Sequence, residues 1–169
     1  MTKYNAGGRG LQDGCKLVEY LITYKKGQHA ELIAEIGVRF AQHHTDILSN
    51  IEYADRVEDF FMACLDIKLI DWAQVFLKAL CTMFPDGIKT MRLLGMFYEA
   101  QGKTFRAQEI YEELLESCPH DTQTVKRLIS LFKCNDMVGD AVNVLNKYLE
   151  TNQIDEEAWM ELADLHLSR

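Results

Sequence analysis

The side chains best suited to catalysis or metal binding are the five histidines and five cysteines of this 169-residue chain. His43 and His44 are adjacent, so on a helix they point about 100° apart and do not share a metal ion as an i, i+4 pair would. Cys118 and His120 flank Pro119, but no third ligand or catalytic base stands at a matching spacing. The sequence therefore predicts no catalytic residue, no metal site and no cofactor.

Two further patterns, a glycine cluster and two acidic groups, suggest phosphate or calcium binding at first, but each lacks a feature that such binding requires. Gly7, Gly8 and Gly10 form a glycine cluster, but no strand precedes it and no Gly-Lys-Ser/Thr follows it. The acidic groups at 112–116 and 155–157 lack the alternating ligands and central glycine of an EF-hand loop. Carboxylates in the second group are better placed to stabilise the positive end of the helix that follows. We therefore expect a chain that is not an enzyme.

Composition favours a folded domain in a reducing compartment. The chain is 48% hydrophobic and 26% charged, which is enough apolar surface for a core. A net charge of -8 argues against nucleic-acid binding, and apolar runs of about six residues fall short of the ~20 that a membrane span requires. The cysteines have no paired spacing and follow no signal peptide, which favours the cytosol or nucleus. They are Cys15, Cys64, Cys81, Cys118 and Cys134.

The elements that position these side chains repeat with a period of 34 residues. This is the interval between the two prolines, Pro85 and Pro119. A 34-residue helix-turn-helix unit is the tetratricopeptide repeat. The sequence predicts an all-α, right-handed superhelical solenoid of antiparallel helix pairs. Three further series of positions share the interval: Ala73, Ala107 and Ala141; Val57, Met91, Val125 and Trp159; Phe60, Leu94, Leu128 and Leu162.

The unit at 88–121 carries the repeat pattern best. Gly95 and Ala107 are small, which lets the two helices of the pair cross closely. Tyr98 and Tyr111 fill the space beside that crossing. Pro119 disfavours helical conformation in the residue before it and so ends the second helix.

The repeats are expected to fill the chain from residue 54 to its end. We predict repeats at about 54–87, 88–121 and 122–155, and the first helix of a fourth at 156–169. Two upstream helices, Leu11 to Lys26 and Gln28 to His43, are predicted within residues 11–53 by helical hydrophobic spacing. Residues 1–10 are expected to be a flexible lead-in.

Several runs go beyond the repeat pattern. They are Met83-Phe84-Pro85, Arg92-Leu93-Leu94-Gly95-Met96 with Glu99-Ala100, and Asp155-Glu156-Glu157-Ala158-Trp159-Met160-Glu161-Leu162-Ala163. With these runs, roughly Leu11 to Leu167 resembles the tetratricopeptide-repeat family of subunit 2 of the endoplasmic-reticulum membrane protein complex. The resemblance implies the N-terminal portion of a longer protein.

That resemblance implies a non-catalytic scaffold, peripheral on the cytoplasmic face of the endoplasmic reticulum. It would cradle cytosolic segments of neighbouring subunits in a complex that inserts transmembrane and tail-anchored proteins. The alternative from the repeat alone is a soluble adaptor or co-chaperone that binds peptides in its groove. A chaperone clamp of Lys and Asn is disfavoured, because the matching places hold Arg92, Met96, Gln123 and Arg127.

Stacked helix pairs line a concave groove with their first helices. In the middle of that face Lys89, Arg92, Lys126 and Lys133 form a basic patch that could hold an acidic peptide; ordinary solvated helix faces are the other interpretation. The partner-binding positions predicted from helical phase are Met62, Lys89, Arg92, Met96, Glu99, Lys126, Ser130 and Lys133. Further positions of the same face are Glu58, Leu65, Gln123, Glu157, Met160 and Asp164.

The last helix has no second helix after it in this chain. Trp159 is predicted to be structural, because its position is one where a large ring packs between hairpins. The unpaired helix is expected to leave the apolar faces of Trp159 and Leu162 partly uncovered. We therefore expect self-association or fraying at this end.

Overall fold

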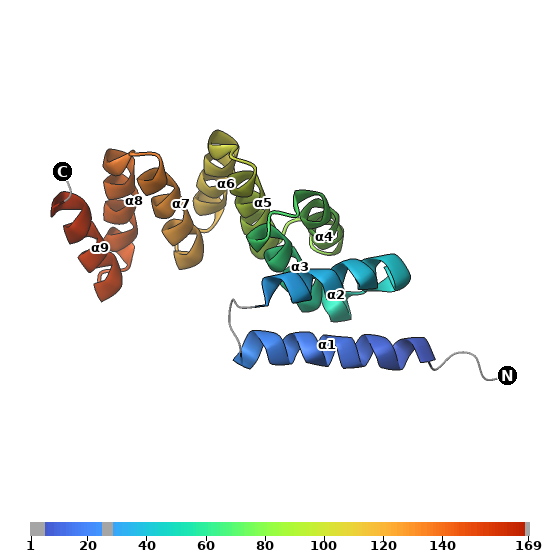
Figure 1. Cartoon of the computed structure of the whole chain (residues 1–169). Coiled ribbons are helices and arrows are strands. Elements are labelled where there is room, and N and C mark those ends of the chain that lie inside the picture. The colour runs from blue at the N-terminus through green and yellow to red at the C-terminus, as the bar shows by residue number, and fades with distance from the viewer. Residues whose placement is uncertain (1–5, 25–28, 168–169) are drawn as a thin grey trace. The chain divides into compact units, whose positions relative to one another are not determined.

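The chain is all-α throughout residues 6–24 and 29–167, which are the residues that the computed structural model describes, with side chains for residues 13–23 and 29–167 (Figure 1). No strand occurs in this part, so the predicted all-α class is confirmed. The α-helices are α1 (Ala6–Tyr24), α2 (Ala30–His43), α3 (Ala54–Asp66), α4 (Ile70–Met83), α5 (Ile88–Ala100), α6 (Thr104–Ser117), α7 (Thr122–Cys134), α8 (Val138–Thr151) and α9 (Glu156–Leu167). Short 3-10 turns at Thr45–Leu48 and Ile51–Tyr53 join α2 to α3.

The turns inside the three helix pairs share one backbone geometry at the 34-residue interval. Lys68, Gly102 and Asp136 have φ values of 60°, 72° and 57°. In each turn the amide of the next residue bonds to a carbonyl five residues back, the Schellman arrangement that ends a helix. These bonds run from Leu69 to Cys64, Lys103 to Tyr98 and Met137 to Phe132, at 2.8, 2.9 and 2.9 Å.

Two of these turns use a residue that the left-handed conformation penalises by roughly 1–2 kcal/mol. We expect Lys68→Gly to raise the free energy of unfolding by about 0.5–1 kcal/mol, after the extra freedom of glycine in the unfolded chain is subtracted. Gly102→Ala should lower it by about 1 kcal/mol, although no atom lies within 4 Å of the added methyl group. Urea denaturation measures both; a Gly102→Ala variant as stable as wild type would contradict the assignment.

The second helices end where the prolines predict. The C-caps of α4 and α6 are Phe84 and Cys118, and each directly precedes a proline. Two of the first helices begin with an aspartate at equivalent positions: Asp121 accepts from the Thr124 amide and Asp155 from the Ala158 amide, at 3.3 and 3.1 Å. These caps satisfy amides that the first turn of a helix leaves without a partner.

The helices form two compact units, residues 1–90 and 91–169. In the first, the Phe60 ring of α3 packs between Phe40 of α2 and Phe76 of α4, with ring centres 6.2 and 5.7 Å apart. A methyl group added at Gly37 would lie 2.5 Å from the Phe60 ring, so α2 approaches α3 closely. The predicted upstream segment therefore shares a core with the first repeat.

The expected lead-in differs from the structure at residues 6–10, which are the first turns of α1. Glycine costs about 1 kcal/mol relative to alanine in a helix, and tertiary packing overrides such preferences. Val18 and Leu21 of the same helix are 0% and 7% exposed. Residues 1–5 of the predicted lead-in lie outside the described residues.

The core of the second unit is formed largely by side chains of α6, α7 and α8. Tyr111, Leu128 and Leu145 are buried, and Ala107 and Ala141 are fully buried beside them. Leu94 is only half-buried, while its neighbours Leu93 and Phe97 are buried. Helix α5 therefore buries residues on more than one side and does not bury a single face alone.

Candidate partner-binding face

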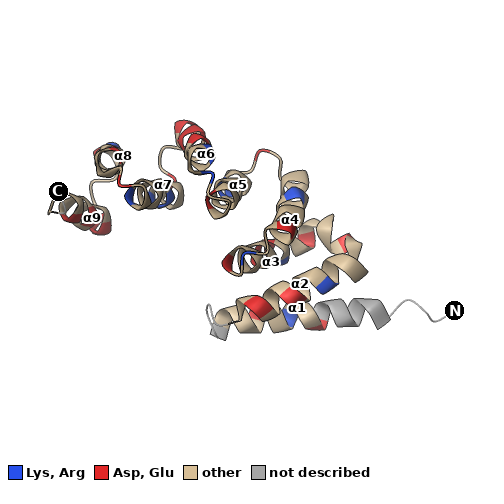
Figure 2. Cartoon of the chain, turned by 45° about the horizontal axis from the view of Figure 1, so that its top comes forward, with Lys and Arg blue, Asp and Glu red and all other residues tan. Residues whose placement is uncertain are grey.

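The first helices α3, α5, α7 and α9 carry the residues predicted to bind a partner, and each of these helices bears charged side chains (Figure 2). In the first unit the Lys89 ammonium pairs with Glu58 and lies 3.8 Å from Asp55. The hydrogen bond to Glu58 is the main reason that the pKa of Lys89 is raised. Lys89 is thus joined to the first helix one repeat earlier.

Arg92 is held inside the protein. Its Nη2 donates to both carboxylate oxygens of Asp121 at 3.0 Å, and its Nε donates to Thr124 Oγ1 at 3.2 Å. Nη1 donates to Gln123. The Arg92 side chain is 15% exposed. Since Asp121 also caps α7, this charge-assisted pair fastens α5 to the start of the next repeat.

The lysines of α7 pair with the following first helix. Lys126 Nζ lies 2.8 Å from Glu157, and Lys133 Nζ lies 3.0 Å from Glu161, both on α9. These lysines are about half exposed, so each pair contributes roughly 0–1 kcal/mol. We call these contacts, together with those of Lys89 and Arg92, the inter-repeat ion pairs.

The predicted basic patch is therefore wrong as a free positive surface. Each of its four cations already has a carboxylate partner 28 to 34 residues away. Helical phase placed them on one face, but phase carries no information about partners on the next repeat. Opposite charges recurring at nearly one repeat length were the sequence signal that would have identified these pairs.

Glu99, another predicted partner-binding residue, is also engaged within the chain. Its carboxylate accepts a hydrogen bond from the hydroxyl of Tyr111 and lies 3.7 Å from Arg127. Tyr111 is fully buried, and burial followed by the Glu99 contact raises the pKa of its hydroxyl. Gly95 makes room for this ring, because a methyl group there would lie 2.6 Å from Tyr111 Cζ. The small residue at 95 thus accommodates Tyr111 directly.

The apolar positions of the face also separate into buried and accessible ones. Met96 is 8% exposed and packs in the core, so the prediction that it contacts a partner is wrong. Met62 is half-buried, and Met160 on α9 is 66% exposed. Ser130 is exposed, and its hydroxyl donates back to the Lys126 carbonyl at 2.9 Å. Met62, Ser130 and Met160 remain available to a partner.

Trp159 does not pack between hairpins as predicted. It is 49% exposed, and its Nε1 donates to the Gln153 carbonyl at 2.9 Å. The equivalent Val57 and Val125 are 0% and 4% exposed, each in a first helix that has a second helix after it. Leu162, in contrast, is 7% exposed in the core, against the expectation that it would be uncovered.

Asp59 on α3 has a shifted pKa that the sequence does not predict. Burial raises its pKa to about 6, although Arg56 Nη1 lies 3.2 Å away and acts in the opposite direction. The two groups lie at ion-pair distance without the alignment of a hydrogen bond, and Asp59 Oδ2 has no other hydrogen-bond partner among the described residues. Nothing in the sequence distinguishes Asp59 from the exposed carboxylates around it.

This raised pKa predicts a stability that increases on mild acidification. The folded protein takes up a proton on Asp59 near pH 6, whereas the unfolded chain does so near pH 4. The contribution of Asp59 to unfolding free energy should therefore grow by about 1 kcal/mol from pH 7 to pH 5. Urea denaturation of wild type and Asp59→Asn at both pH values measures it. An equal pH response in the two proteins would contradict the prediction.

Within residues 6–24 and 29–167, no group of three His, Cys, Asp or Glu side chains could hold a metal ion. Helices that are both long and apolar enough to cross a membrane are likewise not found in the described part. Burial raises the pKa of the Cys64 thiol to about 11, which makes it unreactive.

Antiparallel helix pairs at a 34-residue period, with capped first helices and glycine-sized crossings, define a tetratricopeptide-type helical repeat protein. Solved structures agree on this fold. The MamA protein of Desulfovibrio magneticus RS-1, in a form spanning residue 41 to its end, superposes with a TM-score of 0.51. It is 17% identical, and the match covers 90% of this chain and 94% of that one.

Residues 68–168 match the family described as the EMC2 TPR-like repeat domain, and the chain belongs to this family. Among relatives, the ER membrane protein complex subunit 2 of Xenopus tropicalis is 32% identical over 86% of this chain and 48% of its own length. The Dictyostelium discoideum protein of the same name is 28% identical over 85% and 45%. The TPR repeat protein oca3 of Schizosaccharomyces pombe is 29% identical over 69% and 43%. This chain thus spans about half the length of these relatives.

Proposed function

We propose that this chain is a non-catalytic scaffold of the endoplasmic-reticulum membrane protein complex, bound peripherally on the cytoplasmic face of that membrane. It holds cytosolic segments of neighbouring subunits and thereby supports insertion of transmembrane and tail-anchored proteins. The observation that carries this proposal is the family match over residues 68–168, joined to relatives that are named as subunits of the complex.

The contacts on the first helices support a scaffold better than a peptide clamp. An acidic peptide tail would have to displace Glu157 and Glu161 from the lysines of α7, and Asp121 from Arg92. Each displacement leaves a carboxylate without its partner, so little net affinity is gained. Binding of an acidic tail, as in the co-chaperone alternative, would therefore break the inter-repeat ion pairs. We assign the partner contacts to Met62, Ser130 and Met160.

Affinity purification in mild detergent tests the proposal. The tagged chain is expected to recover membrane-spanning subunits of the complex, and recovery of cytosolic chaperones alone would contradict it. Ser130→Arg places a bulky cation on an exposed position of the face and should reduce recovery. Gln74→Arg, an exposed change on α4 that adds the same single charge, is the matched control and should leave recovery unchanged.

We further propose that the exposed side of α9 mediates self-association of this chain. Trp159 and Met160 are 49% and 66% exposed on it, and Ile154 just before it is 93% exposed. Exposed apolar side chains at one end of a protein favour association when no partner covers them. Light scattering should show a mass that increases with concentration and a smaller increase for Trp159→Ser with Met160→Ser. A monomer at all concentrations would contradict this.

A further inference from the structure

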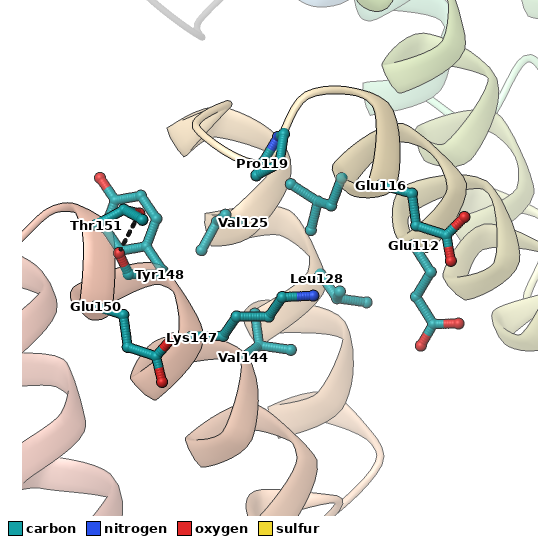
Figure 3. A pocket seen from close by; sticks show the side chains of 11 residues that line it. Glu112, Glu116, Pro119, Val125, Leu128, Val144, Lys147, Tyr148, Glu150 and Thr151 are labelled. Atoms are coloured by element: carbon teal, nitrogen blue, oxygen red, sulfur yellow. Dashed lines mark hydrogen bonds between the residues drawn. The ribbon is translucent and has the colours of Figure 1, made fainter.

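A pocket of about 430 Å³ lies in the second unit, lined by side chains of α6, α7 and α8 (Figure 3). Val125 and Leu128 of α7 contribute core side chains that are 4% and 1% exposed. Leu115 of α6 and Val144 of α8 are half-buried beside them. Pockets of 300–1,000 Å³ with mostly apolar linings are typical of sites that bury a ligand group. This one offers an existing apolar surface to a single large side chain.

The charged side chains of the pocket are predominantly acidic. Glu112 and Glu116 on α6 and Glu150 on α8 are exposed, against one cation, Lys147 (Figure 3). Glu112 accepts a hydrogen bond from Gln108 at 2.8 Å. No basic side chain of the described residues forms an ion pair with any of the three carboxylates.

The two kinds of surface in this unit therefore differ in available charge. On the first helices the lysines and Arg92 are neutralised by the inter-repeat ion pairs, whereas on α6 and α8 the carboxylates have no cation partner. Unpaired charge around an apolar centre selects a binding partner of opposite sign. The centre supplies affinity by excluding water from an apolar side chain.

We propose that this pocket binds a protein segment that presents one large apolar side chain flanked by lysines or arginines. The apolar side chain lies against Val125, Leu128 and Val144, and the flanking cations pair with the three glutamates. Segments next to membrane spans are rich in lysine and arginine on the cytosolic side. Assigning the segment to a membrane-spanning subunit rests on the proposed function; the chemistry of the pocket does not.

Three fluorescein-labelled peptides titrated into the whole chain test this proposal. The first is Lys-Arg-Ala-Trp-Ala-Ala-Arg-Lys, the second has Glu and Asp in place of its cations, and the third has Ser in place of Trp. The basic peptide should bind with an affinity that falls as salt rises. The Ser peptide should bind on the order of ten-fold more weakly, and the acidic peptide should not bind. Amide NMR shifts should map to α6, α7 and α8.

Matched variants distinguish binding in the pocket from non-specific attraction of the basic peptide to an acidic protein. Val144→Lys should abolish binding of the basic peptide, and Glu116→Gln with Glu150→Gln should weaken it several-fold and flatten its salt dependence. Glu109→Gln with Glu113→Gln removes the same charge from exposed positions of α6 outside the pocket and should change little. Circular dichroism monitors folding in each. The exposed glutamine variants keep the test valid should Val144→Lys fail to fold.

Equal weakening by the two glutamine pairs, equal binding of the acidic peptide, or shifts confined to α5 and α9 would overturn the proposal. So would the same shifts without peptide at high protein concentration, since the occupant would then be a second copy of the chain. These results are independent of the detergent purification. The pocket proposal can fail while the chain still recovers membrane-spanning subunits.

Discussion

Gly95→Ala should destabilise the protein by about 2–4 kcal/mol, the larger of two expected effects. The added methyl group would lie 2.6 Å from Tyr111 Cζ, well inside the contact distance of carbon atoms. Tyr111 is fully buried, so its ring cannot move aside into solvent. Forcing extra volume into a packed core costs about 1–3 kcal/mol, and displacing the hydroxyl from the Glu99 carboxylate adds the loss of a charge-assisted hydrogen bond. Urea denaturation provides the measurement.

A second variant shows whether the ring is the cause. Tyr111→Leu alone should also destabilise the protein, because it leaves a cavity. Combined with Gly95→Ala, it should cost clearly less than the sum of the two single changes, since the methyl group then fills vacated space. Strictly additive effects would show that Gly95 and Tyr111 do not constrain one another.

Arg92→Met should lower the free energy of unfolding by about 1.5–3 kcal/mol. Methionine keeps most of the length of the side chain and removes the ion pair with Asp121 and the hydrogen bond to Thr124. The pair is largely shielded from water, with side chains 15% and 18% exposed, so bulk solvent does not replace the lost contacts. The loss should appear in chemical denaturation at neutral pH.

Lys126→Met is the matched control for Arg92→Met. It removes an ion pair of the same series, but one whose lysine is 50% exposed, and should cost less than about 1 kcal/mol. Raising the salt concentration should reduce the effect of Lys126→Met and leave that of Arg92→Met nearly unchanged. Similar costs for the two variants would contradict the view that Arg92 is a structural link between repeats.

The architecture was accessible from the sequence because the repeat imposes one spacing on many residues. Small residues at Gly95 and Ala107 and prolines after the second helices follow from what a close crossing and a helix end require. The left-handed turn could have been extended from Gly102 to Lys68 and Asp136 at the same interval. Lysine at this position carries no local signal for a left-handed turn; the Schellman hydrogen bonds from Leu69 and Met137 accompany that backbone at Lys68 and Asp136.

The partner-binding face was less accessible, for a physical reason. Helical phase tells which side of a helix a residue occupies, but not what the neighbouring helix places against it. Met96 has the same helical phase as the exposed Ser130 and is nevertheless buried. Arg92 forms an ion pair with Asp121 and is therefore not available to a partner. Trp159 shows the converse, because it shares the repeat position of the buried Val57 and Val125 and is nevertheless 49% exposed.

Photo-crosslinking from position 130 in the assembled complex tests the central claim most directly, namely that the first helices of this chain hold a neighbouring subunit. A photoreactive residue in place of the exposed Ser130 leaves the inter-repeat ion pairs intact. The scaffold role predicts a crosslink to the cytosolic segment of a membrane-spanning subunit. A crosslink only to cytosolic chaperones, or none while position 113 on α6 crosslinks instead, would contradict it.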